Sequence, residues 1–106
     1  MTSYAVLWSE RKEGVDVGRL ELDTCGLRFE GARVVGGAPR THRLYYEDIE
    51  AVRVGREPSE RLAGRPSLVV DRYTGSPVRI GSIAGIGALH ELVERLGHRK
   101  VTALAV

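Results

Sequence analysis

The sequence predicts a small α+β domain, mainly β, in which short antiparallel strands precede one C-terminal amphipathic helix. Two pairs of strand-like segments flank turn residues, as in β-hairpins, and the first pair alternates apolar and polar residues. Near the C-terminus the apolar spacing changes to three and four, which is typical of a helix. The length of 106 residues suits one domain, so we expect a single domain over 1–106.

The first hairpin is predicted around a turn at 23–26. Leu20 and Leu22 alternate with charged residues before this turn, and Leu27 and Phe29 resume the alternation after it. The glycine that ends the turn, Gly26, is free to take a positive φ angle. We therefore expect two paired strands, each with one buried face.

Further strands follow a loop expected over 31–39. Residues 43–46 are predicted to be extended, and one of the adjacent tyrosines Tyr45 and Tyr46 is expected in the core, because neighbouring strand residues face opposite sides. The alternation from Ile49 to Val54 is broken once, which indicates a bend or bulge. A second hairpin is predicted from 67–73 and 78–80, with its turn at 74–77.

The helix is predicted from Ala84 to about Gly97, with Ser82 as its N-cap and Gly97 as its stop. Its apolar stripe should cover the open end of a rolled sheet. The members of that stripe are Ile83, Ile86, Leu89, Leu92, Val93 and Leu96. The apolar tail from Val101 to Val106 could add an edge strand.

Composition excludes several classes of protein. The net charge is only +2, because 14 acidic residues nearly balance 16 basic ones, so no nucleic-acid partner is expected. Cys25 is the only cysteine, which rules out a disulfide within the chain and favours a reducing compartment. No apolar run reaches the ~18 residues that a membrane span needs, and no signal peptide is recognised. We therefore expect a cytoplasmic protein without a transmembrane segment.

Glycines, strand aliphatics and one tyrosine recur in a recognisable order over about 17–97. The positions are Gly18, Leu20, Leu22, Gly26, Leu27, Phe29, Tyr46, Ile49, Val52 and the hairpin from Leu68 to Ile80, followed by the closing helix. This pattern resembles the bacterial pleckstrin-homology-like family, including its GRAM-type members. The resemblance implies a barrel of two nearly orthogonal antiparallel sheets, capped at one end by the C-terminal helix.

The same resemblance implies a binding or assembly module and not an enzyme. The phosphoinositide-binding members of that family carry a basic pair or triplet in the loop between their first two strands. Residues 23–26 carry no basic residue, which speaks against inositol-phosphate binding.

Three motifs resemble catalytic, nucleotide-binding or metal-binding sites, but a purely structural role explains each of them better. The glycines of 81–87 resemble a dinucleotide-binding turn, but too few residues follow for a βαβ fold. His90, Glu94 and His98 lack the spacing of a zinc-protease motif and belong to the polar face of the helix. Cys25 has no histidine near it in sequence. We expect no catalytic residue, no cofactor and no metal.

An arginine cluster is the strongest candidate site. Arg53, Arg56, Arg61 and Arg65 fall in and around one loop, and Arg43 lies nearby in sequence. Such a cluster could bind phosphates, anionic lipid heads or an acidic partner. Glutamates interleave with it, so a solvated loop of mixed charge is the alternative.

Three functions follow in order of preference. The first is a non-enzymatic module that recognises a protein segment, or a second copy of itself, through a sheet edge or groove beside the C-terminal helix. The second is peripheral binding of anionic lipid or phosphate through the arginine-rich loop. The third, a small enzyme, is disfavoured because no titratable pair is positioned for acid–base chemistry.

Overall fold

The computed structural model describes residues 3–10 and 14–104, with side chains as far as Gly97. Its elements alternate strands and short connections until the final helix. They are β1 (Ser3–Glu10), β2 (Asp16–Leu22), β3 (Gly26–Arg33), β4 (Pro39–Tyr45), η1 (Tyr46–Asp48), β5 (Ile49–Gly55), η2 (Pro58–Glu60), β6 (Ser67–Arg72), β7 (Val78–Ser82) and α1 (Ile86–Leu104). The predicted fold class, mainly β with one C-terminal helix, is confirmed.

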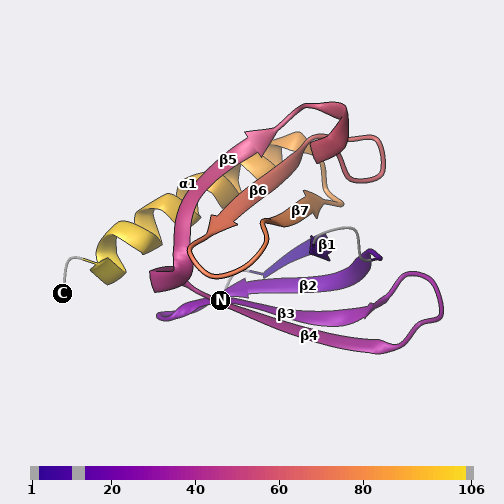
Figure 1. Ribbon diagram of the computed structural model, residues 1–106, viewed down its shortest axis with the longest axis horizontal. Coiled ribbons are helices and arrows are strands. Elements are labelled where there is room, and N and C mark those ends of the chain that lie inside the picture. The colour runs from indigo at the N-terminus through magenta and orange to yellow at the C-terminus, as the bar shows by residue number, and fades with distance from the viewer. Residues whose placement is uncertain (1–2, 11–13, 105–106) are drawn as a thin grey trace.

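All seven strands in the described part of the chain belong to one antiparallel sheet of order β4-β3-β2-β1-β7-β6-β5. The sheet curls into a half-barrel, and α1 lies against the part that contains β5, β6 and β7 (Figure 1). The long-range pairing of β1 with β7, in which Val6 faces Ser82, joins the two hairpin regions. β4 and β5 therefore form the two edges of the sheet.

The core fills the concave face of the sheet beneath α1. Trp8, Phe29 and Leu20 are buried within the sheet, and Leu92 and Leu96 of α1 are buried against it. Gly18 and Gly31 face each other across β2 and β3, where a Cβ on either would collide with the neighbouring backbone. These glycines permit the close approach that the curl of the sheet requires.

Several local predictions are confirmed. The strands around 20–22 and 27–29 pair directly, and the second hairpin pairs Leu68 with Ile80. The register of β5 shifts between Ile49 and Ala51, where the broken alternation predicted a bulge. Tyr46 is buried at 1% exposure while Tyr45 is 51% exposed, so the inward-facing tyrosine is Tyr46.

The predicted ends of the helix are wrong. Ser82 is the last residue of β7, and α1 begins at Ile86, after Gly85 turns the chain with φ of 112°. Gly97 lies within α1, which continues to Leu104, so 101–104 are helical and do not form an edge strand. Residues 105–106 lie outside the described residues. Packing of the preceding turns on the sheet stabilises the helix beyond a glycine that local preference would make its end.

Other details also differ from the predictions. The loop expected over 31–39 is shorter, because β3 continues to Arg33 and β4 begins at Pro39. Gly26 does not adopt a positive φ; it is buried in β3, where a Cβ would collide with the carbonyl oxygen of Leu44. No helix of the described residues is both long and apolar enough to cross a membrane.

Candidate functional site

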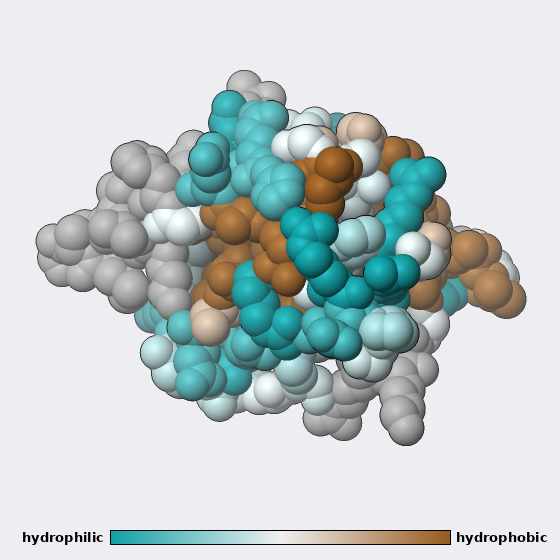
Figure 2. Space-filling model, turned by 90° about the horizontal axis from the view of Figure 1, so that it is seen from above, coloured by the Kyte–Doolittle hydropathy of each residue, from teal (hydrophilic) through white to brown (hydrophobic). Residues whose placement is uncertain are grey.

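Where the edge strand β5 lies beside α1, some apolar side chains remain partly exposed, and we call the surface that they form the groove. Val52 and Val54 of β5 and Val93 of α1 are only partly buried, although all three pack against the core. The face that carries β5 and α1 accordingly shows apolar surface bordered by hydrophilic side chains (Figure 2). An edge strand beside this groove offers both backbone hydrogen bonds and contacts for side chains.

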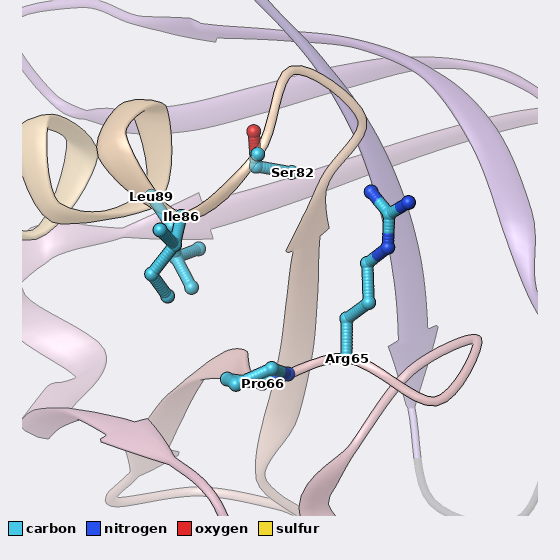
Figure 3. A pocket seen from close by; sticks show the side chains of 6 residues that line it. Arg65, Pro66, Ser82, Ile86 and Leu89 are labelled. Carbon is cyan, nitrogen blue, oxygen red and sulfur yellow. The ribbon is translucent and has the colours of Figure 1, made fainter.

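At the N-terminal end of α1 lies a hollow of about 280 Å³, which we call the anchor pocket. Its lining is mainly apolar and comes from the start of β6, the β7–α1 junction and the first helical turn. The lining residues are Arg65, Pro66, Ser82, Gly85, Ile86 and Leu89. Ile86 and Leu89 face Pro66 across the hollow, and the Arg65 side chain extends away from Pro66 on the other side of β7 (Figure 3). Ile86 is 46% exposed, so the helical stripe is only partly used by the core.

A second hollow, of about 350 Å³, lies on the other side of the β7–α1 junction. It shares Arg65, Pro66 and Ser82 with the anchor pocket. Its remaining walls are Leu7, Leu62, Ala63, Gly81 and Ile83. Ile83 is 49% exposed, so this member of the predicted stripe also points out of the core.

Residues 56–66 connect β5 to β6, and we call this connection the arm. It positions Arg65 at the common rim of the two hollows. Leu62 and Arg65 exchange backbone hydrogen bonds of 2.9 and 3.0 Å around a two-residue turn. Both turn residues are left-handed, with φ of 52° at Ala63 and 74° at Gly64. This geometry belongs to a type I′ turn, which holds Arg65 beside Leu62.

Four of the five predicted arginines gather on or beside this arm. Arg53 forms an ion pair with Glu60, and Arg61 donates a hydrogen bond of 3.0 Å to the carbonyl oxygen of Arg56. Arg56, Arg61 and Arg65 are exposed. The arm therefore presents three arginines to solvent, while Arg53 is paired with Glu60, one of the glutamates that interleave with the arginines in sequence.

Arg43 does not join this group. It lies on β4, at the opposite edge of the sheet, and donates hydrogen bonds of 2.6 and 3.1 Å to the Asp23 carboxylate. Burial acts to raise the pKa of Asp23, but the hydrogen bonds from Arg43 and from the amides of Cys25 and Gly26 outweigh it, so this pKa lies below its ordinary value. Arg43 thus stabilises the β2–β3 turn through its contact with Asp23.

The two sheet edges differ in how well they could accept another strand. β4 begins with Pro39, which has no N–H to donate, and continues through Arg40 and Arg43. Proline and arginine on an edge strand discourage pairing. β5 also carries charged residues, Glu50 and Arg53, but it contains no proline and pairs with β6 alone within the described residues. Strand addition is therefore favoured at β5.

One polar cluster was not predicted from the sequence. His42 stacks on Trp8 with ring centroids 5.1 Å apart, and its Nε2 lies 2.7 Å from Oδ2 of the buried Asp16. Arg33 donates a hydrogen bond of 2.7 Å to the same carboxylate. These residues come from four strands, so only the pairing of the strands reveals the cluster. It closes one end of the core.

The motifs considered for chemistry remain dispersed. His90 and Glu94 are exposed on α1, and the side chain of His98 lies outside the described residues. Cys25 is exposed in the β2–β3 turn, where its sulfur lies 3.9 Å from the Thr24 hydroxyl. Over the described residues, no three histidine, cysteine or acidic side chains come together as metal ligands could.

Comparison of the chain with models of protein families finds no match, and comparison with curated proteins finds none either.

Proposed function

We propose that the chain is a non-enzymatic binding or assembly module of the pleckstrin-homology-like fold, which recognises an extended protein segment. The segment would add to the β5 edge and lie in the groove beside α1. Two observations carry this proposal: the apolar side chains of Val52, Val54 and Val93 are only partly buried, and the anchor pocket lies at the N-terminal end of the same helix. The strand order and the C-terminal helix support the choice of fold family.

Binding by strand addition suits this surface for a physical reason. The outer edge of β5 supplies backbone donors and acceptors in a fixed row, which bind any extended chain without regard to sequence. Apolar contacts along the groove add affinity, and side chains that alternate toward the groove can be distinguished by the pockets they enter. A second copy of the chain could supply the segment as well as another protein could.

The test is selection of a phage-displayed library of random peptides on the intact protein, followed by binding measurements with the recovered peptides. The decisive variant is Ile86→Glu, which puts a charge into the groove at an exposed site. Because an acidic residue is favourable in the first turn of a helix, this variant should fold normally. We expect it to abolish binding.

Val34→Glu is the matched control, since Val34 is 54% exposed against 46% for Ile86 but lies between β3 and β4, in the other half of the sheet. It should bind the selected peptides as the unmodified protein does. Hydrogen exchange should show slower exchange of β5 amides when peptide is bound. Peptides that bind equally to the Ile86→Glu variant, or that leave β5 exchange unchanged, would contradict the proposal.

A further inference from the structure

From the surroundings of the anchor pocket we infer that the bound segment is acidic, and that it places an apolar side chain in the pocket and a carboxylate on Arg65, across the β7–α1 junction. This inference rests on the proposed function, because it specifies the segment that the β5–α1 groove would accept. It concerns the chemistry of the partner and not the place where it binds.

The size and lining of the pocket define the apolar part of the segment. A dry apolar cavity of ~150 Å³ is enough to hold benzene. The anchor pocket, at about 280 Å³, therefore has room for the side chain of a leucine or a phenylalanine. Ile86, Leu89 and Pro66 provide apolar walls, so a buried anchor there would gain hydrophobic contacts.

The charges around the pocket define the acidic part. Arg65 lies on its rim, and Arg56 and Arg61 are exposed on the same arm. The acidic residues of the arm do not cancel this charge: Glu60 is only 18% exposed and is held by Arg53, which leaves Glu57 against three arginines. An arginine fork suits a carboxylate better than any neutral group.

Arg65 is the arginine that would bind the carboxylate of the segment. It borders both the anchor pocket and the second hollow, and its side chain extends away from Pro66 past β7 (Figure 3). The tight turn at Ala63 and Gly64 fixes its backbone by two hydrogen bonds to Leu62. A carboxylate within a few residues of the anchor could therefore reach Arg65 while the anchor side chain fills the pocket. Arg56 and Arg61 would add attraction over a longer range.

The experiment begins with the sequences of the peptides selected on the unmodified protein. We expect a leucine or aromatic residue with an aspartate or glutamate close to it. Binding of a fluorescein-labelled peptide of that kind, measured by fluorescence anisotropy, should weaken about 10-fold in the Arg65→Glu variant, where an attraction is replaced by a repulsion. A peptide with lysine in place of its acidic residue should bind this variant better than it binds the unmodified protein.

Arg28→Glu is the matched control, because it makes the same change in net charge at an exposed arginine of β3, far along the sheet from β5. It should leave affinity almost unchanged. If selected peptides bind, lose binding with Ile86→Glu, but respond equally to Arg65→Glu and Arg28→Glu, the acidic segment is refuted and the groove stands. If Ile86→Glu has no effect, the groove itself is refuted.

Membranes provide the competing outcome for the same arginines. We would measure binding of the unmodified protein and of the Arg65→Glu variant to phosphatidylcholine vesicles with and without phosphatidylserine. We expect the two proteins to bind each kind of vesicle to the same extent. Should the selection recover no peptide while Arg65→Glu releases the protein from phosphatidylserine vesicles, the partner is an anionic membrane and the inference of an acidic protein segment is wrong.

Discussion

Substitution of Asp23 tests the β2–β3 turn, in which the Asp23 carboxylate binds Arg43 of the edge strand β4. The Asp23 carboxylate accepts backbone hydrogen bonds from Cys25 at 2.8 Å and Gly26 at 2.9 Å, besides its ion pair with Arg43. Its side chain is 44% exposed, so each interaction contributes less to the unfolding free energy than it would in a buried site. With about 1 kcal/mol for the two amide bonds together and at most about 1 kcal/mol for the pair, Asp23→Ala should cost roughly 1–2 kcal/mol of unfolding free energy.

Asp23→Asn separates the two contributions, because the amide oxygen can still accept from both backbone N–H groups while the charge is lost. We expect a cost of about 0.5 kcal/mol, close to that of Arg43→Gln. Urea titration monitored by the fluorescence of Trp8, the only tryptophan, measures all three variants. The reasoning fails if Asp23→Ala is neutral, or if Asp23→Asn costs as much as Asp23→Ala.

The pH dependence of the same comparison follows from the lowered pKa of Asp23. A carboxyl whose folded-state pKa lies below its unfolded value stabilises the fold above the unfolded pKa, and this contribution is lost as pH falls through the folded value. The stability difference between the unmodified protein and Asp23→Asn should therefore be complete at neutral pH. It should shrink once the pH falls below the ordinary carboxyl value of 3.8. A difference that stays constant into acid would contradict this assignment.

Three further predictions use the same urea titration. Gly31→Ala should lower the unfolding free energy by about 1–3 kcal/mol, since the added Cβ would lie 2.7 Å from the Cα of Gly18; a neutral result would show that the sheet is not so closely curled. Gly97→Ala should raise it by up to about 1 kcal/mol, because Gly97 is inside α1 with open space around it, whereas a loss would mean that the helix ends there. Ala63→Asn should raise it by about 0.5–1 kcal/mol, because asparagine suits the first position of a type I′ turn, and destabilisation would argue against that turn.

The strands could be predicted because their signals are local. Alternation of apolar and polar residues at 20–22 depends only on the two faces of a strand, and the apolar run at 68–70 beside a turn indicates a strand equally locally; both segments pair as the predicted hairpins require. The same rule identified one inward-facing tyrosine at 45–46, although the choice of Tyr46 needed the structure. The helix limits were less predictable, since packing of Leu92 and Leu96 against the sheet overrides the local preference of Gly97.

The candidate site was only partly predictable. The density of arginine in 53–65 pointed to the arm, and Arg56, Arg61 and Arg65 are exposed there. The ion pair of Arg53 and the remote position of Arg43 could not be foreseen, because each depends on which strand lies beside another. The anchor pocket was missed for the same reason: Pro66 and Ile86 belong to different elements and meet only across the β7–α1 junction.

The sequence by itself determined the mainly β class, the two hairpins and the existence of a C-terminal amphipathic helix, since spacings of two, three and four residues express backbone geometry directly. Only the tertiary structure decided that β1 pairs with β7, that β5 is the edge beside α1, and that Ile83 and Ile86 remain exposed. An apolar stripe indicates that one face of a helix is buried, but it does not indicate which element packs against that face. Ile86 is left 46% exposed, and this uncovered part of the stripe forms a wall of the anchor pocket.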